Sequence, residues 1–267
     1  MNSSKLSKDI KLSCLRMIYE SNASHIGSAL SIADILSVLY ADIMQTFPEN
    51  PNHPNRDRFI LSKGHAASIL YALLGELKYF EKAKLSNYGK NGDILMNHVS
   101  HKIPGVEFST GSLGHGLSFG AGKALAAKKK GETWNTYVLM SDGELQEGSI
   151  WEALMFSAHH KLDNIVAIID YNKLQSLKSI NETLNIEPLK QKFASFGWHV
   201  LEVEGHDHKD LKKTFFEAKK VKNKPQIIIA NTVKGKGVSF MENSIKWHYK
   251  TPNKRDYLKA IQEVKNA

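Results

Sequence analysis

The sequence has almost no cysteine, since Cys14 is the only one among 267 residues. A single cysteine excludes a disulfide within the chain and fits a reducing compartment, so we expect a cytoplasmic protein. Cys14 lies in an amphipathic, helix-like segment. We therefore expect it to be a small buried hydrophobic residue rather than a reactive thiol.

Long apolar runs are absent too. No stretch of about 18 consecutive apolar residues occurs, which is the minimum for a membrane-spanning helix. The first 20 residues carry charges throughout and lack the apolar centre of a secretory signal. We therefore expect neither a membrane span nor a signal peptide.

Negative charge is scarcer than positive charge, and the formal net charge is +9. The lysines and arginines gather in short clusters at 128–130, 219–224 and 250–255. Aromatic residues are not interleaved with them as in a groove that stacks nucleic-acid bases, so we expect no nucleic-acid partner. A basic surface favours small anions such as sugar phosphates.

Five short apolar segments predict the strands of a sheet: 136–141, 165–170 and 227–232, with weaker candidates at 199–203 and 58–62. Continuous apolar runs are typical of parallel strands that are buried on both faces. Helix-length segments separate them at 114–130, 149–161, 189–196 and 209–220, and further helices are predicted at 5–21, 31–41, 66–80 and 254–264. The sequence predicts an α/β fold, a doubly wound, mostly parallel sheet with helices on both faces, as one domain over residues 1–267.

Polar residues follow two of these predicted strands at the points where the strands end. Asp142-Gly143 follows 136–141, and Asn172 follows 165–170. Ligands bind at the carboxyl ends of parallel strands, and carboxylate and amide oxygens suit Mg²⁺ completed by phosphate oxygens. The Leu174 carbonyl is a plausible third protein ligand, and Gly143 would let the backbone approach a phosphate closely.

Simpler explanations exist for these residues. Asp142-Gly143 is also a common turn, and Asn172 could cap a helix. A catalytic zinc site is disfavoured because no HExxH or paired CxxC spacing occurs, and the Lys234–Gly237 segment lacks the P-loop pattern. The two polar groups together, about 30 residues apart on consecutive strand ends, favour the metal and phosphate site.

This spacing resembles the thiamine-diphosphate signature, with Ser141 in place of its first glycine. Four further segments resemble transketolases, in the order found in that family. They are Ser24-His25-Ile26-Gly27, DRFILSKGHA at 57–66, Asn97-His98 with GVEFSTGSLG at 105–114, and GKGV at 235–238 with Trp247-His248. The resemblance extends from about residue 24 to residue 252, and its main departures are Ile26, His115 and Tyr249.

The resemblance implies roles for individual residues. His65, His248, Gly143 and Asn172 would hold the cofactor's diphosphate, and Gly111, Ser112 and Leu113 would line its two rings. Mg²⁺, or Ca²⁺ or Mn²⁺ in its place, would bind Asp142, Asn172 and the Leu174 carbonyl. His25, His98 and His248 would face substrate hydroxyls and move protons. Glu147, together with Glu152, would lie at a subunit interface near a catalytic Glu of the partner.

The remaining histidines are expected to be structural or exposed. They are His53, His101, His159, His160, His199, His206 and His208, and the pairs around His101 and His206 are predicted to be polar loops. His115 is left undecided because it lies inside one of the matching segments.

The resemblance also implies an activity and a partner. A transketolase transfers a two-carbon ketol unit from a ketose phosphate donor to an aldose acceptor. The catalytic Glu for the pyrimidine ring would lie on a second, C-terminal (pyrimidine-domain) subunit, so we expect an α2β2 assembly with an apolar interface. Two alternatives stay open: a subunit of a two-oxoacid dehydrogenase or synthase that uses the same cofactor, and a regulatory subunit that has lost catalysis.

Overall fold

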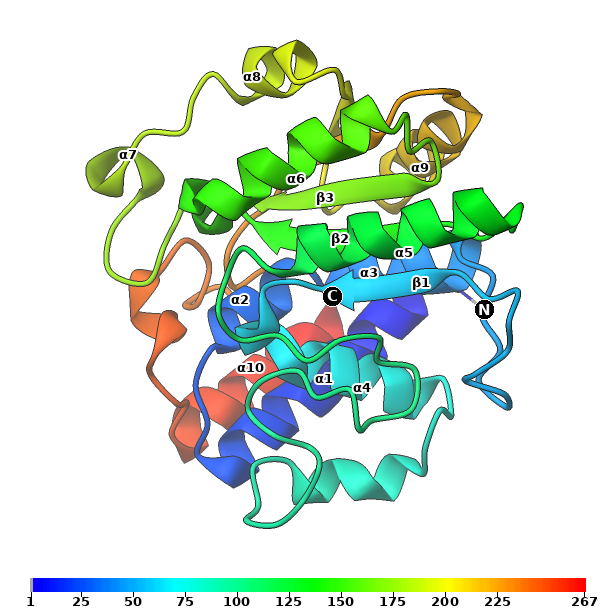
Figure 1. Ribbon diagram of the computed structural model, residues 1–267. Coiled ribbons are helices and arrows are strands. Elements are labelled where there is room, and N and C mark those ends of the chain that lie inside the picture. Colours follow the sequence, from blue (N-terminus) through cyan, green and yellow to red (C-terminus); the bar gives the residue numbers. More distant parts are fainter. Residues whose placement is uncertain (1) are drawn as a thin grey trace.

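A five-stranded sheet forms the centre of the computed structural model, which describes residues 2–267 (Figure 1). The strands are β1 (Arg58–Leu61), β2 (Thr136–Ser141), β3 (Ile165–Tyr171), β4 (His199–Glu204) and β5 (Gln226–Asn231). Their spatial order is β1-β2-β3-β5-β4, and each neighbouring pair is parallel. The five predicted strands are confirmed, with ends that shift by at most one residue.

Helices cover both faces of the sheet. One face packs against α1 (Ser3–Ser21), α3 (Ala33–Val38), α4 (Ala67–Glu76) and α9 (His208–Lys220), and the other against α5 (Gly116–Lys130), α6 (Gly148–His159) and α8 (Leu189–Ser195). Alternation along β2 divides its side chains between the two cores: Tyr137 and Leu139 enter the first, Val138 and Met140 the second. The predicted doubly wound fold is confirmed.

Local signals in the sequence set the ends of these helices. Asp207 caps α9 by accepting hydrogen bonds from the amides of Lys209 and Asp210, and Gly131 ends α5 in the left-handed conformation at φ 69°. After the sheet, α10 (Lys254–Asn266) packs on α1, where the Tyr19 and Tyr257 rings stack with centroids 4.3 Å apart. Cys14 of α1 is fully buried, as predicted, and burial raises the pKa of its thiol to about 12.

Two predicted helices are wrong in part. The helix expected at 31–41 is instead α2 (Ile26–Ser31), α3 and a π-helical turn η1 (Leu39–Ile43), with a break at Ile32 (φ −106°, ψ 3°). Every residue of the segment 26–40 is buried, so no exposed face gives the periodicity that would mark the break. The helix expected at 66–80 ends at Glu76 because Lys78 adopts the left-handed conformation (φ 65°).

Short elements were not predicted from the sequence. They are α7 (Ile180–Thr183) and the 3-10 turns η2 (Gly64–Ala66), η3 (Lys82–Asn87), η4 (Gly143–Gln146) and η5 (Ile245–His248). The signal for α7 is a capping box, in which Ser179 and Glu182 bond each other's backbone amides. Within residues 2–267, no helix has the length and apolar character needed to cross a bilayer.

Candidate active site at the carboxyl ends of the strands

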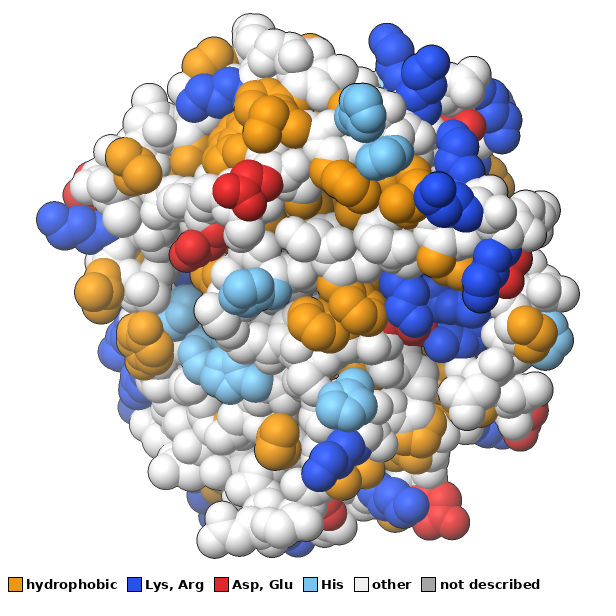
Figure 2. All heavy atoms as spheres, viewed as in Figure 1, with side chains coloured by type: hydrophobic (Ala, Val, Ile, Leu, Met, Phe, Trp, Pro, Cys, Tyr) orange, Lys and Arg blue, Asp and Glu red, His pale blue; other side chains and the backbone are white. Residues whose placement is uncertain are grey.

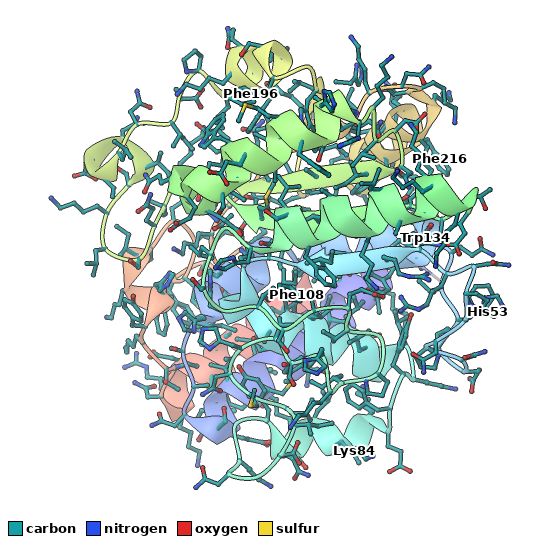
Figure 3. All side chains as sticks on the ribbon, in the orientation of Figure 1. His53, Lys84, Phe108, Trp134, Phe196 and Phe216 are labelled. Carbon is teal, nitrogen blue, oxygen red and sulfur yellow. The ribbon has the colours of Figure 1, made fainter. Side chains whose placement is uncertain are left out.

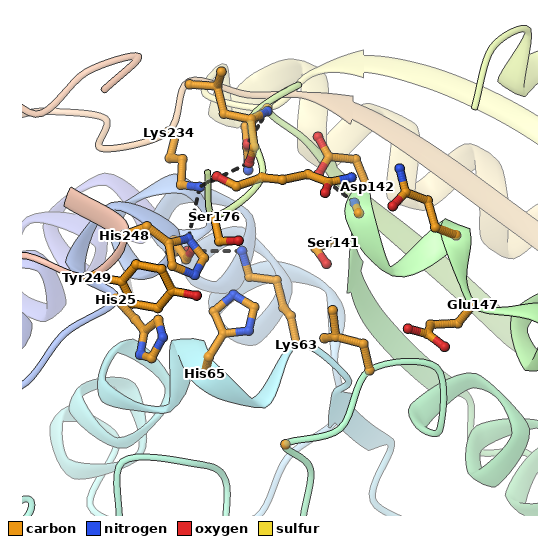
Figure 4. Close-up of a pocket in the computed structure, with 18 of the residues that line it drawn as sticks. His25, Lys63, His65, Ser141, Asp142, Glu147, Ser176, Lys234, His248 and Tyr249 are labelled. Carbon is orange, nitrogen blue, oxygen red and sulfur yellow. Dashed lines mark hydrogen bonds between the residues drawn. The ribbon is translucent and has the colours of Figure 1, made fainter. Parts of the chain in front are cut away.

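A cavity of about 400 Å³ lies at the carboxyl ends of the strands (Figure 4). Its walls come from α2, η2, η4 and η5 and from the segments that follow β1, β2, β3 and β5. We call it the pocket. The lining includes all of the residues predicted for the site except Ser112 and Glu152. This position matches the expectation for an open parallel sheet.

One end of the pocket is formed where β2 and β3 end side by side. Ser141 pairs with Asp170 in the sheet register, which places Asp142 beside the segment that starts at Asn172. Asp142 Oδ2 accepts a hydrogen bond of 2.6 Å from the Lys173 amide, and Oδ1 one of 2.8 Å from the Gly143 amide. The carboxylate is 2% exposed, and burial, with the nearby charge of Asp170, raises its pKa to about 7.

Asn172 is fixed from two sides. Its Nδ2 donates to Asp170 Oδ2 at 2.9 Å, and its Oδ1 accepts from the Leu174 amide at 3.1 Å. The Leu174 carbonyl accepts a hydrogen bond from Lys234 Nζ at 3.0 Å. The predicted side-by-side placement of Asp142 and Asn172 is therefore what the fold gives. An oxygen set of one carboxylate, one amide and one carbonyl faces this end of the pocket.

A buried ion pair lies beneath this end. Lys63 Nζ lies 2.5 Å from Asp170 Oδ2 and also donates to the Ser28 carbonyl at 3.0 Å. Burial alone would raise the pKa of Asp170, but the Lys63 ammonium and hydrogen bonds from Ser31 and Thr232 hold it below its usual range. The pair ties β1 to β3 under the pocket floor.

Four histidines form the other end of the pocket. The His25 ring lies 5.1–5.9 Å, centroid to centroid, from the rings of His65, His98 and His248. The backbone also joins them, because the His25 amide donates to the His248 carbonyl at 2.7 Å, with His25 in the left-handed conformation (φ 71°). These rings come from four separate segments, as the sequence predicted.

The surroundings of this group lower the pKa values of three of its imidazoles, those of His25, His65 and His248. Burial, followed by the charges of neighbouring histidines and lysines, lowers the pKa of His25 to about 4 and that of His248 to about 3. Burial and Lys63 likewise hold the pKa of His65 well below its usual range. No carboxylate hydrogen-bonds these rings among the described residues. A bound anion would reverse part of this effect, because it favours the protonated form.

Other predicted site residues take varied positions. Gly111 and Leu113 line the pocket, whereas Ser112 is exposed and lies outside the lining. Glu147 is exposed at the pocket's mouth, directly before α6 (Figure 4). Glu152 is exposed on α6, and His115 is exposed just before α5.

Sequence reasoning missed several lining residues, of which Lys63 and Lys234 are the most buried, at 1% exposed each. Lys234 Nζ donates to the carbonyls of Leu174 and Gln175 at 3.0 and 2.8 Å and lies 3.1 Å from His248 Nδ1. Burial, then Lys63, lowers its pKa to about 8. The rule that selected Asp142 and Asn172 would have found both, since they follow β1 and β5.

Among the residues that the structure describes, no three His, Cys, Asp or Glu side chains are arranged to hold a metal ion. The candidate cation site is instead the oxygen set of Asp142, Asn172 and the Leu174 carbonyl. Three protein oxygens leave positions for other oxygen ligands, which is the usual arrangement for Mg²⁺ next to a phosphate.

Comparison with known proteins shows which family this chain belongs to. Residues 3–264 match the transketolase, thiamine diphosphate binding domain family. The chain is 43% identical over 250 residues to one subunit of the apulose-4-phosphate transketolase of Phocaeicola vulgatus, covering 94% of this chain and 89% of that protein. It is 38% identical to a 6-deoxy-6-sulfo-D-fructose transketolase subunit of Clostridium sp., covering 94% and 91%.

Solved structures agree with the sequence comparison. The crystal structure of transketolase from Campylobacter jejuni superimposes with a TM-score of 0.94 at 33% identity, and covers 99% of this chain. This chain spans only 43% of that transketolase, so it corresponds to less than half of the solved enzyme. With the family match, the subunit relatives and the shared fold in agreement, the chain belongs to the transketolase family of transferases and corresponds to its thiamine-diphosphate-binding domain.

Proposed function

We propose that the chain is the N-terminal subunit of a split transketolase. It transfers a two-carbon ketol unit from a ketose phosphate donor to an aldose acceptor, with thiamine diphosphate and Mg²⁺ (or Ca²⁺ or Mn²⁺). The observation that carries the proposal is the pocket, in which a Mg²⁺-type oxygen set and four histidine side chains face one cavity. Residues 1–267 form one cofactor-binding domain in this proposal.

The donor set of the pocket fits the cofactor's charged end. Asp142, Asn172 and the Leu174 carbonyl offer oxygens to the metal, and Asp142 is buried without a hydrogen-bonded cation. Lys234, His65 and His248 offer positive charge or N–H groups to phosphate oxygens. Gly143 adds a close backbone approach, since a Cβ there would lie 3.3 Å from the Gln175 side chain. Gly111 and Leu113 line the space left for the cofactor's rings.

When bound, thiamine diphosphate supplies the carbon centre that carries the ketol unit. The protein orients the reactants and moves protons. His25, His98 and His248 lie where a polyhydroxylated substrate would enter. The low pKa values of His25 and His248 keep these two imidazoles neutral at pH 7. This end suits sugar hydroxyls better than the carboxylate of a two-oxoacid.

The partner in this proposal is a C-terminal, pyrimidine-domain subunit in an α2β2 assembly. Apolar side chains gather over α5 and α6 on the face of the molecule that also shows the histidine-lined hollow (Figure 2). They include Met155 and Phe156, which are 55% and 41% exposed, and Phe108, which stacks on Phe119 of α5 with centroids 4.3 Å apart (Figure 3). Such a patch beside an open site supports a partner that completes the site. Glu147, at the mouth, would meet this partner.

We infer that the reaction takes place in the cytoplasm, in keeping with the single cysteine of the chain.

We infer that the substrates are sugar phosphates or related anionic sugars. The net charge of +9 supports anionic substrates. Two relatives are named for apulose 4-phosphate and for 6-deoxy-6-sulfo-D-fructose, and both compounds carry an anionic group on a ketose. A panel of donors should therefore include linear and branched ketose phosphates.

The test is to co-express the chain with a candidate C-terminal partner and to assay ketol transfer with thiamine diphosphate and Mg²⁺. Xylulose 5-phosphate and apulose 4-phosphate serve as donors, ribose 5-phosphate as acceptor, and pyruvate as the competing substrate. We expect transfer by the pair only and its loss with Asp142→Ala, while Asp9→Ala, on the exposed surface of α1, keeps it. Use of pyruvate instead of ketoses would contradict the proposal, as would a formed pair that binds no cofactor.

A further inference from the structure

A second group of histidine and carboxylate side chains lies outside the pocket, around Asp34 of α3. Asp34 is 5% exposed, and its Oδ1 accepts hydrogen bonds from Ser7 Oγ at 2.5 Å and Lys11 Nζ at 2.9 Å. His206, which follows β4, and His208, the first residue of α9, contact it at 2.8 and 3.3 Å. We call these five residues the Asp34 cluster. The sequence predicted only a polar loop here.

The two ring nitrogens of His206 have different partners, and these partners fix its tautomer. Nε2 accepts a hydrogen bond of 2.8 Å from the Val233 amide, so Nε2 carries no proton. Nδ1 therefore carries the proton and donates it to Asp34 Oδ2 at 2.8 Å. A doubly protonated ring could not accept from Val233. The Asp34 carboxylate thus stabilises the His206 tautomer in which Nδ1 carries the proton and Nε2 is an acceptor.

The Val233 amide belongs to the segment that carries Lys234 into the pocket. Lys234 is the next residue, and its ammonium bonds the carbonyls of Leu174 and Gln175. On the other side of Lys234, the Gly235 amide donates to the Gly27 carbonyl at 2.9 Å. The backbone is therefore held on both sides of Lys234. The His206 side chain bonds the amide before it, and the Gly27 carbonyl of α2 bonds the amide after it.

Close packing brings His206 up to this segment. A Cβ added at Gly205 would lie 2.4 Å from Thr232 Cγ2 and 2.9 Å from the Asn231 carbonyl oxygen, so the backbones of the two strand ends touch. The Gly205 amide also donates to the Asn231 carbonyl at 2.8 Å. The side chain of His206, 10% exposed, is directed by this contact onto Val233.

We propose that the Asp34–His206 pair is a positioning device that sets Lys234 in the pocket. Asp34 selects the tautomer of His206, His206 holds the Val233 amide, and Val233 fixes the backbone from which Lys234 reaches the carbonyls of the cation site. The consequence for cofactor binding rests on the proposed function of the pocket. His206 does not line the pocket, so it is proposed as a positioning residue.

Asp34→Asn tests the tautomer directly because it leaves His206 in place. Lys11 has only donors, so it would attract the Asn oxygen and turn the Asn amide group toward His206 Nδ1. That ring nitrogen would then become the acceptor, and the proton would move to Nε2, opposite the Val233 N–H. Asp34→Asn should therefore break the hydrogen bond from the Val233 amide to His206, as should His206→Leu, which removes the ring. His206→Gln should restore the contact, since its amide oxygen can reach the Nε2 position.

The experiment has two readouts. The first is amide hydrogen exchange of the chain, in which His206→Leu and Asp34→Asn should speed exchange in 233–238. The matched control His208→Leu, which removes a contact to Asp34 but none to Val233, should not. The second is binding of thiamine diphosphate with Mg²⁺ by the pair with its partner subunit. We expect His206→Leu to weaken binding roughly tenfold, the size typical of lost outer-shell partners.

A double variant decides whether His206 acts through Lys234. If it does, His206→Leu with Lys234→Met binds cofactor no more weakly than Lys234→Met alone. Additive losses, or equal effects of His208→Leu and His206→Leu, would overturn the proposal. If His206→Leu fails to fold, Asp34→Asn and His206→Gln give the same comparison. Faster exchange in 233–238 without cofactor binding by the wild-type pair would support positioning of the segment and contradict the proposed function.

Discussion

The two groups of histidines in this protein use the same side chain in opposite ways. In the pocket, His25, His65 and His248 face one another and lysines, and their pKa values are lowered. In the Asp34 cluster, His206 and His208 face a carboxylate. A ring with both nitrogens paired holds structure in place, whereas a neutral ring without an acidic partner is free to meet a ligand.

The carboxylates differ in the same sense. Burial would raise the pKa of Asp34, but hydrogen bonds from His206 and His208, with the charge of Lys11, hold it well below its usual range. Asp142 has only backbone amides as hydrogen-bond donors, and its pKa is raised to about 7. The buried carboxylate without a cation is the one to which the proposed function assigns a metal ion.

The largest expected effect separates function from stability among the histidines. His25→Asn should lower ketol transfer by the pair at least about 100-fold, the range for a positioned proton-transfer group, without lowering the free energy of unfolding. His208→Asn should keep transfer within about twofold and lose about 1 kcal/mol, as for one hydrogen bond. Enzyme assays and urea unfolding of both variants check this. Equal losses of transfer in the two variants would erase the distinction.

The same comparison applies to the carboxylates. Asp34→Asn should lower the free energy of unfolding by about 3 kcal/mol, because it leaves Lys11 buried beside a neutral group. Asp142→Asn should change the stability of the ligand-free chain by less than about 1 kcal/mol, because it removes a buried charge without a cationic partner. Chemical denaturation at pH 8 measures both. A large destabilisation by Asp142→Asn would show that its charge is compensated in the free chain.

As the pH is lowered from neutral, the histidines of the pocket should be the first groups to lower the free energy of unfolding. Unfolded histidines titrate near about 6.5, whereas His25 and His248 titrate at about 4 and about 3 in the folded chain. In this window the two histidines bind protons in the unfolded state only, whereas Asp142, with its raised pKa of about 7, binds one in the folded state. The histidine effect is the larger, so stability falls as the pH falls from about 6.5 toward 4. Asp34, whose folded pKa is depressed, keeps its contribution there and loses it only at lower pH.

Melting temperatures measured between pH 4 and 8 check this, with and without inorganic pyrophosphate. The anion should flatten the acid loss by favouring the protonated histidines, and His25→Asn should reduce the slope in its absence. An unchanged slope in His25→Asn would assign the pH dependence to groups outside the pocket.

The smallest expected effect concerns the rim. Tyr249 is 59% exposed, with its ring 4.7 Å from that of His248, centroid to centroid. Tyr249→Gly should change KM for the sugar about three- to tenfold, in the range for added or lost contacts in a binding site. Binding of thiamine diphosphate should stay unchanged, and Tyr249→Phe separates the hydroxyl from the ring. Steady-state kinetics and calorimetry provide the two measurements, and a matching loss of cofactor affinity would place Tyr249 at the diphosphate end.

The sequence predicts the strands and the residues that follow them because buried parallel strands carry a strong local pattern. That pattern located Asp142 and Asn172, and the same rule applied to the other strands would have added Lys63, His206 and Lys234. Each of these residues follows a different strand of the sheet. They were missed because a single lysine or histidine after a strand has no motif of its own.

Long-range contacts account for what the pattern could not give. His206 lies outside the pocket because β4 is the edge strand beyond β5. The local sequence pattern predicts strands but not their order in the sheet. The break between α2 and α3 depends on packing as well, since a Cβ at Gly27 would lie 3.3 Å from the Trp247 carbonyl oxygen.

The unequal exposure of the pocket walls has an evolutionary consequence. Lys63 and Lys234 are 1% exposed and bonded to several segments, so a substitution there disturbs the end of the cavity that is proposed to hold the cofactor. Tyr249 is mostly exposed and has no such bonds to break among the described residues. Substitutions at Tyr249 can therefore change which sugar binds, while the buried end of the pocket around Lys63 and Lys234 keeps its contacts.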